Sequence, residues 1–421
     1  MPSSLSPAPS QAHYLQHLLD SSRPFLRDEL ESVDKNLPSL VAVLRSAGAG
    51  ESWHKLSNFL DHLVDIYRIL KIWKAPNSVC LCGLLHSSYA ISNTNLGIFD
   101  PSTDREVVRT HVGDEVERLI HLYCIVPRHH LIRHDLLFHY SDSELVEHLK
   151  LSEISLSNAM HKALFNEEEP WRKKLQALLP ADGITVKHVK TSQDVPVSRR
   201  VVAVFLLMTL ADFSEQYFGF QDALFENFNG RLEISGNNCA ALWPGDGKPG
   251  LWLNYLSRLG ALYNLIVREE EIFKEERKRV GGGAEYKHTQ RDEDIELVVP
   301  PVFENCKRVL DAGEQIVARD LYWEAVCDMS KKNPEELLLR SIEKNPFVGE
   351  PHVVLGQVYL TKGMFEEAER GLTLMLEWGS SWDKRMSWKV WIAWARVLLI
   401  KAKEKSWPKT SGGIYILGLV K

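Results

Sequence analysis

Apolar residues recur at helical spacing through most of the chain. Between residues 56 and 70 they fall at i, i+3, i+4 and i+7, which predicts an amphipathic helix with one buried face. The segment VCLCGLLHSSYA (79–90) is apolar nearly all round, so we expect a helix at the centre of a bundle. Residues 198–218, with Ser198 as the N-cap, and residues 251–277 predict two longer helices. The pattern therefore favours an all-α fold.

The helical pattern is interrupted in the middle of the chain. Residues 105–127 predict a helix that breaks at Gly113. The region near 128–197 has a less regular pattern, and we expect it to be an insertion. Its elements are predicted to be helices near 142–150 and 155–165 and a short hairpin within 183–198, where β-branched and polar residues alternate.

One polar, glycine-rich segment suggests a domain boundary. RKRVGGGAEYKHTQRDEDIELVVPP (277–301) contains three consecutive glycines, dense mixed charge and a terminal Pro-Pro, which is typical of a linker. A chain of 421 residues also exceeds one ordinary core. We therefore expect an N-terminal helical extension (1–48), a first helical domain (49–276), the linker (277–301), a second helical domain (302–407) and a tail (408–421).

Composition and charge narrow the classes of function. The net charge is −6, from 50 basic and 56 acidic residues, so no global basic field attracts nucleic acid or an anionic membrane. No stretch reaches the roughly 18 apolar residues of a membrane span. The 6 cysteines include no CxxC pair and are typical of reduced thiols. We expect a cytoplasmic protein that binds neither nucleic acid nor membrane, with organelle targeting by the Ser/Pro-rich N-terminus left open.

The second half contains a segment with the spacing of a helical repeat. Small and aromatic residues between 346 and 376 keep this spacing: Leu355, Gly356, Tyr359, Gly363, Phe365 and Ala368. They resemble one tetratricopeptide repeat, and the resemblance implies helical hairpins that bind a protein partner through residues 302–407. The alternative is a helical domain packed on the first half, with Trp388, Trp391 and Trp394 as core residues.

Two histidines and a later acid stand in apolar helical segments. His62 lies in HLVDIYRIL, His86 in CLCGLLHS and Asp212 in LADFSEQ. With the intervening REVVRTHVGDEVERLI, these segments resemble the HD superfamily of metal-dependent phosphohydrolases, and within it the guanosine-tetraphosphate hydrolase domains. The resemblance implies an HD-like helical bundle in which the three residues would bind a divalent metal. Imidazole and carboxylate ligands together suit Mn, Fe or Zn.

The serine after His86 departs from the family pattern. Ser87 stands where the HD site has the aspartate of its His-Asp pair, and SSYAIS (87–92) contains no acid. A serine hydroxyl is neutral at pH 7 and a poor ligand for a divalent metal. We therefore expect a regulatory or scaffolding protein with a degenerate HD-like domain and a tetratricopeptide-like interaction region. The alternative is a metal-dependent phosphohydrolase acting on a nucleotide or small phosphoester.

Charged residues elsewhere offer alternatives to a metal at Asp212. A buried acid needs a partner, and Arg199, Arg200 or a histidine would serve as well as a metal. Arg105 and Arg109 would face either a phosphate in the same cleft or solvent. The sequence alone decides neither the partner of Asp212 nor the surroundings of Arg105 and Arg109.

Two further segments are chemically suggestive but non-specific. RHHLIRHDLLFH (128–139) places His130 and His134 at i, i+4, which would either pinch a metal or form part of the surface; no HExxH motif accompanies them. The loop at 237–254 lacks GxxxxGK[ST] because Pro249 follows Lys248. Either an anion-binding nest or a structural loop is expected there.

Overall fold

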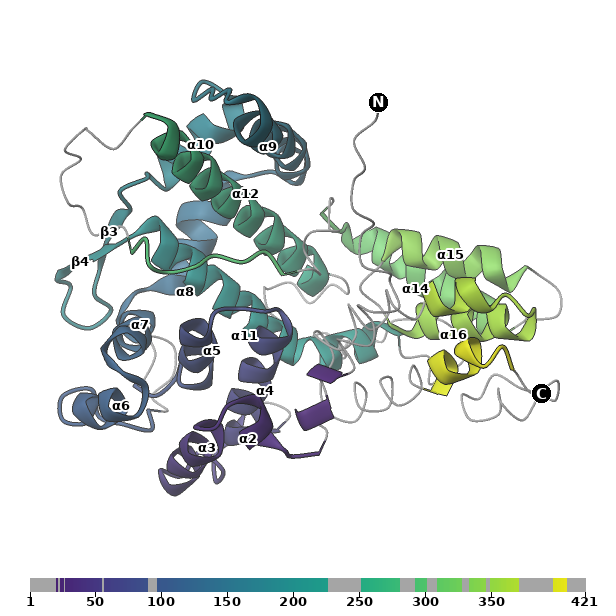
Figure 1. Ribbon diagram of the computed structural model, residues 1–421, viewed down its shortest axis with the longest axis horizontal. Helices are drawn as coiled ribbons and strands as arrows, with labels where there is room; N and C mark the ends of the chain where they lie inside the picture. The colour runs from purple at the N-terminus through teal and green to yellow at the C-terminus, as the bar shows by residue number, and fades with distance from the viewer. Residues whose placement is uncertain are drawn as a thin grey trace. The chain divides into compact units, whose positions relative to one another are not determined.

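The structure, a computed structural model, is mostly helical. It describes residues 20–21, 23–25, 27–54, 57–89, 97–225, 251–280, 292–300, 309–327, 333–345, 349–370 and 397–406. Within them, strands form only two-stranded hairpins, so the all-α prediction is confirmed (Figure 1). None of the helices in these ranges combines the length and apolarity needed to cross a membrane.

The chain divides into two compact units, each discontinuous in sequence. The bundle unit consists of Asn36–Phe213 and Tyr255–Val309. The hairpin unit consists of Met1–Lys35, Ser214–Asn254 and Leu310–Lys421. This grouping differs from the contiguous domains expected on either side of residues 277–301.

Long helices dominate the bundle unit and the segments that extend from it. They are α3 (Leu37–Ser46), α4 (Phe59–Ile72), α5 (Asn77–Leu84), α6 (Arg105–Val112), α7 (Asp114–Ile125), α9 (Asp142–Lys162), α10 (Pro170–Leu178), α11 (Arg199–Phe225) and α12 (Leu251–Val280). Helix α5 packs against α4 and α7. The side chains of residues 201–211 on α11 are all buried, which agrees with the apolar run seen in the sequence. The core of this unit therefore forms around α4, α5, α7 and α11.

Short elements connect these helices. They are β1 (Trp53–His54), β2 (Ser57–Asn58), α8 (Arg128–His130), the π-helix η1 (Leu131–Leu136), the 3₁₀ helix η2 (Leu137–His139), β3 (Ile184–Lys187) and β4 (Asp194–Val197). The predicted hairpin is confirmed, because β3 pairs antiparallel with β4. Ser198 also caps α11 as expected, since its Oγ accepts the Val201 N–H at 3.2 Å.

Two helix boundaries differ from the sequence predictions. The helix expected over 79–90 ends at Leu84, so His86 lies in the following turn. Its ring bonds the Gly83 carbonyl, one of the terminal carbonyls that a continuing helix would otherwise have to satisfy. The two helices expected near 142–150 and 155–165 are one continuous helix, α9, which a Ser141–Glu144 capping box starts. The predicted break at Gly113 is present between α6 and α7, where this glycine adopts a φ of 85°.

Part of the expected linker is anchored to the bundle unit. Asp292 is buried, and its Oδ1 accepts a hydrogen bond from Arg118 at 2.5 Å. Further along, Tyr263 donates its hydroxyl hydrogen to the Val298 carbonyl at 2.8 Å. Residues 292–300 are therefore bonded to helices of the bundle unit, although their charged composition suggested a flexible linker.

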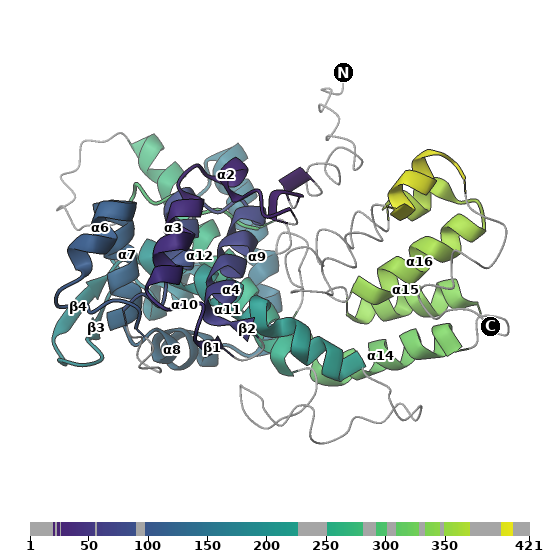
Figure 2. The ribbon, with the colours of Figure 1, turned by 90° about the horizontal axis from the view of Figure 1, so that it is seen from below.

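The described part of the hairpin unit contains α2 (Leu30–Val33) and three helices that follow one another along the chain. These three are α14 (Ala312–Cys327), α15 (Pro334–Lys344) and α16 (Gly349–Thr361). Helix α15 packs against both α14 and α16 (Figures 1 and 2). Gly363 adopts a φ of 74° in the turn after α16, and a further helix begins at Phe365. The three predicted core tryptophans lie outside the described residues.

Candidate metal centre

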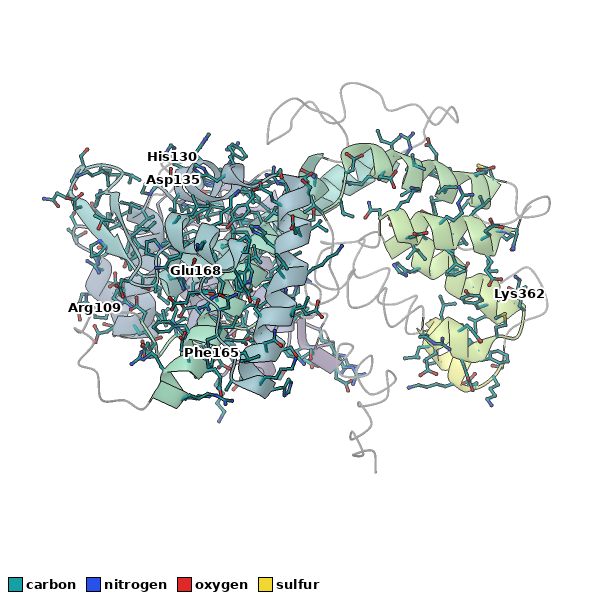
Figure 3. All side chains as sticks on the ribbon, turned by 90° about the horizontal axis from the view of Figure 1, so that it is seen from above. Arg109, His130, Asp135, Phe165, Glu168 and Lys362 are labelled. Carbon is teal, nitrogen blue, oxygen red and sulfur yellow. The ribbon has the colours of Figure 1, made fainter. Side chains whose placement is uncertain are left out.

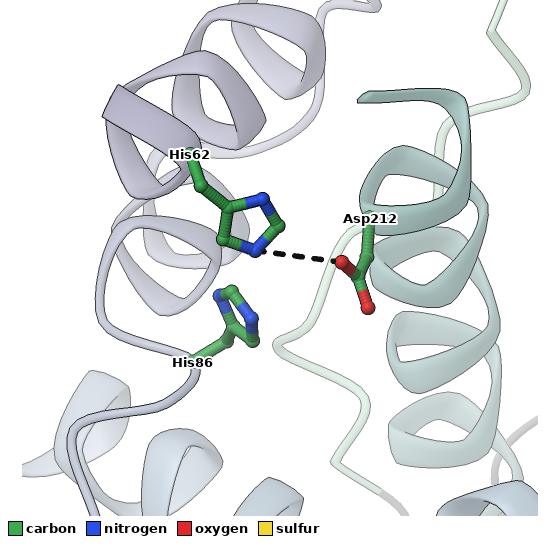
Figure 4. A group of neighbouring side chains, drawn as sticks. All are labelled: His62, His86 and Asp212. Carbon is green, nitrogen blue, oxygen red and sulfur yellow. Dashed lines mark ion pairs between the residues drawn. The ribbon is translucent and has the colours of Figure 1, made fainter. Parts of the chain in front are cut away.

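The three predicted ligands come together in the bundle unit. His62 lies on α4, His86 follows α5 and Asp212 lies on α11, and their exposures are 1%, 3% and 8%. One ligand atom from each lies within 4.8 Å of the other two (Figure 4). Among the described residues, no other group of three histidine, cysteine or acidic side chains has this arrangement. Residues that are far apart in sequence therefore form one compact, buried cluster.

Asp212 is paired with a histidine. His62 Nε2 lies 3.5 Å from Asp212 Oδ1. The two arginines proposed as alternative partners, Arg199 and Arg200, both pair with Glu270, at 3.3 and 3.0 Å. Asp212 is thus held beside an imidazole, at a separation that a shared metal ion also requires.

His86 presents one ring nitrogen to the cluster. Its Nδ1 lies 2.8 Å from the Gly83 carbonyl, which can only accept, so Nδ1 carries the hydrogen. Burial lowers the pKa of His86, and the charge of Arg128 lowers it further, against the opposing charge of Asp212. The ring is therefore neutral at pH 7, with the lone pair on Nε2. A backbone carbonyl bonded to the remote nitrogen is the usual support of a metal-binding histidine.

The residues fit a divalent transition metal. Two imidazoles and one carboxylate form a donor set that suits Zn, Fe or Mn and keeps coordination positions open. In a tetrahedral site, ligand atoms about 2.1 Å from the ion lie about 3.4 Å apart. The ligand atoms of the cluster lie within 4.8 Å of one another, so the most widely separated pair would approach by about 1 Å on binding an ion. The His62–Asp212 separation of 3.5 Å already suits adjacent ligands.

The segment after His86 supplies no carboxylate to this cluster. Ser87 and Ser88 are both buried. The Ser88 carbonyl accepts hydrogen bonds from the Ile98 and Phe99 N–H groups, at 2.9 and 2.8 Å. These bonds fix the backbone directly after Ser87. Ser87 therefore lies in an ordered turn.

Sequence reasoning missed two residues beside the cluster, Tyr123 and Arg128. The ring centroids of Tyr123 and His86 lie 5.8 Å apart, with the rings nearly perpendicular. The Arg128 guanidinium carbon lies 4.1 Å from the Tyr123 ring centroid. Burial raises the pKa of Tyr123 to about 12, so its hydroxyl stays protonated. The one signal in the sequence was the position of Arg128 directly after the apolar run LYCIVP (122–127), which favours burial of its side chain.

Arg105 and Arg109 pair with acidic side chains of the bundle unit. Arg105 forms two hydrogen bonds of 2.7 Å with the buried carboxylate of Glu117, which also accepts the Tyr89 hydroxyl at 2.9 Å. Arg109 pairs with Glu106 at 2.5 Å and lies 3.6 Å from Glu117. Of the two alternatives that the sequence left open, a phosphate or solvent, the structure shows neither as the main partner, because carboxylates balance both charges.

His130 and His134 form an exposed pair instead of a metal centre. The rings of His130 and His134 stack with centroids 4.9 Å apart. His130 Nε2 lies 3.4 Å from Asp135 Oδ1, and the His130 side chain is 64% exposed (Figure 3). Exposed rings remain hydrated and mobile, so this geometry supports the surface interpretation. Most of the glycine-rich loop (237–254) lies outside the described residues.

Comparisons with known proteins identify one region. A family model described as a domain of unknown function (DUF6817) matches residues 43–128. The match includes His62, His86 and Arg128 and ends before Asp212. No curated protein matches the chain. No solved structure matches it either.

Proposed function

We propose that the bundle unit binds a divalent metal and acts as a metal-dependent phosphohydrolase on a nucleotide or small phosphoester. One observation carries the proposal, the convergence of His62, His86 and Asp212 in a buried position. Burying three polar side chains in one place is costly unless they satisfy one another or bind an ion. The resemblance of the surrounding segments to HD phosphohydrolases supplies the reaction class.

Each residue of the centre would have a defined task. His62 and His86 would supply neutral nitrogen ligands, and Asp212 the one negatively charged ligand. A bound divalent metal provides Lewis acidity that lowers the pKa of water and neutralises phosphoryl charge. In the hydrolysis, the oxygen of water bonds to phosphorus, the phosphorus–oxygen bond of the ester breaks, and a proton passes to the departing oxygen.

A regulatory or scaffolding role is the second candidate. It is favoured by Ser87 and Ser88, because the segment lacks the acids that would assist hydrolysis in a guanosine-tetraphosphate hydrolase domain. The packed helices α14, α15 and α16, with the tetratricopeptide-like spacing, would then provide the surface for a protein partner within residues 302–407. The metal in this case would stabilise the fold.

Hydrolysis of simple phosphoesters separates the two candidates. The full chain, loaded with Mn, Fe or Zn in turn, is assayed on p-nitrophenyl phosphate and on a panel of nucleotides. We expect metal-dependent release of phosphate that His62→Ala abolishes and His130→Ala leaves unchanged. A protein that retains its metal yet hydrolyses nothing in the panel would contradict the phosphohydrolase and favour the regulatory role.

A further inference from the structure

Arg128 is a buried cation with no acidic partner among the residues that the structure describes. Its side chain is 1% exposed, and within the same residues neither Nε nor Nη1 has a hydrogen-bond partner. The other fully buried arginines of the bundle unit each pair with a carboxylate: Arg68 with Asp65, Arg172 with Glu269 and Arg199 with Glu270. Among the described residues, Arg128 is the exception. A buried guanidinium without an anion is strongly unfavourable, so this position calls for one.

Arg128 lies next to the candidate metal centre. Its guanidinium carbon is 4.1 Å from the centroid of the Tyr123 ring. That ring is nearly perpendicular to the His86 ring, with centroids 5.8 Å apart. One aromatic ring therefore connects Arg128 with a proposed metal ligand.

The charges of the loaded centre indicate the kind of anion that would fit. Two imidazoles are neutral, Asp212 contributes one negative charge, and a divalent metal with Arg128 contributes three positive charges. The centre would then have two positive charges in excess. A dianionic phosphoryl group balances them, whereas a neutral ester or a single carboxylate does not.

We propose that Arg128 is a phosphate-binding residue, which with the metal selects ligands that carry a dianionic phosphoryl group. This inference rests on the proposed function and narrows its substrate class to phosphate monoesters. The planar guanidinium donates parallel hydrogen bonds that match two phosphate oxygens. Its Nε and Nη1, which have no hydrogen-bond partner in the described part of the chain, are the donors available for that purpose.

A purely structural role is the competing explanation. The contact of Arg128 with the Tyr123 ring would by itself stabilise a buried cation. In that case Arg128 would affect folding but not the affinity for anions. The two roles therefore differ in a ligand-dependent measurement and not in stability alone.

The test is a titration of the Mn-loaded full chain with inorganic phosphate, followed by calorimetry, with sulfate and chloride for comparison. Arg128→Met removes the charge, and Arg128→Lys keeps the charge without the planar fork. Arg133→Met is the matched control, since Arg133 also lies over an aromatic ring, 5.7 Å from the Phe138 centroid. The metal content of every variant is measured first.

We expect Arg128→Met to retain its metal and bind phosphate at least about tenfold more weakly, the loss of one charge-assisted hydrogen bond or more. Arg128→Lys should bind it more weakly than wild type, and it decides the question if the methionine variant does not fold. Equal affinity in wild type and both Arg128 variants, or no binding of phosphate by wild type, would overturn the proposal.

The experiment distinguishes a failure of the proposed metal centre from a failure of the Arg128 proposal. A wild-type protein that retains no metal contradicts the proposed function by its metal content. The arginine is then tested by the melting temperature of the metal-free protein. A phosphate-dependent rise in wild type that Arg128→Met and Arg128→Lys both reduce would support the anion site, and identical rises would overturn it.

Discussion

The two groups of histidines in the bundle unit differ in how they are assembled. His62 and His86 come from separate segments, are buried and meet Asp212 from a third element. His130 and His134 are neighbours on one turn, and their rings stack on the surface. Because His130 and His134 are close in sequence, their rings touch, but they are not part of a buried group of three metal-binding side chains. Burial and convergence, rather than the number of histidines, distinguish a candidate metal centre from a polar surface.

The largest expected effect is on stabilisation by metal. Added Mn or Zn at about 100 times its dissociation constant should stabilise the wild-type fold by about 2.7 kcal/mol, because only the folded chain assembles the ligands. His62→Ala should remove this stabilisation, and His130→Ala should preserve it. Thermal unfolding with and without metal measures both. If the two variants respond alike, the distinction between the groups fails.

Substituting the acids extends the comparison to the carboxylates. Asp212→Asn should weaken metal binding at least about tenfold, because an amide oxygen is a poorer ligand than a carboxylate. Asp135→Asn, beside His130 on the surface, should leave metal affinity within about twofold of wild type. Competition with a chromogenic chelator measures each affinity. An Asp212→Asn protein with wild-type affinity would exclude this carboxylate as a ligand.

The same contrast of buried and exposed groups applies to stability. Glu117 is buried and accepts bonds from Arg105 and Tyr89, whereas the Glu106 side chain is 74% exposed. Glu117→Gln should lower the free energy of unfolding by about 2 kcal/mol, because Arg105 then lacks its anion. Glu106→Gln should change it by less than about 0.5 kcal/mol. Urea denaturation would contradict this account if both variants lost the same amount.

The smallest effect concerns pH. Burial acts to raise the pKa of Glu117, but hydrogen bonds from Arg105 and Tyr89 outweigh it and hold the pKa below its ordinary value of 4.5. A carboxyl whose pKa is lowered by folding contributes stability above the unfolded-state pKa and loses it as the pH falls through the folded-state pKa. The difference in unfolding free energy between wild type and Glu117→Gln should therefore be largest above about pH 5. It should shrink in more acidic solution, and a constant difference from pH 7 to pH 3 would argue against the ion pair.

Local periodicity predicted much of the bundle. The repeated apolar face placed His62 on a helix, and the β-branched alternation indicated the hairpin before α11. The turn at His86 was not predictable in this way, because a hydrogen bond between its ring and the Gly83 carbonyl ends the helix. Similarly, the charge-rich stretch near Asp292 suggested a linker. Its anchoring was not predictable from the local sequence, because Asp292 bonds with Arg118, a residue far away in the chain.

The candidate site was predictable only as far as a family pattern reached. That pattern supplied His62, His86 and Asp212, whose convergence depends on the packing of α4, α5 and α11. Arg128 and Tyr123 belong to no motif. Tyr123 reaches His86 because α7 packs on α5, and Arg128, at the start of α8, lies over the Tyr123 ring. A buried arginine is recognisable as unusual only once its surroundings are known.

The most direct test is the metal content of the full chain purified without chelators, measured by elemental analysis. The account predicts about one Mn, Fe or Zn per chain in the wild type and in His130→Ala, and almost none in His62→Ala. A wild type without metal after Mn, Fe and Zn have each been offered, or a His62→Ala variant that retains it fully, would contradict the assignment of the buried cluster as a metal centre.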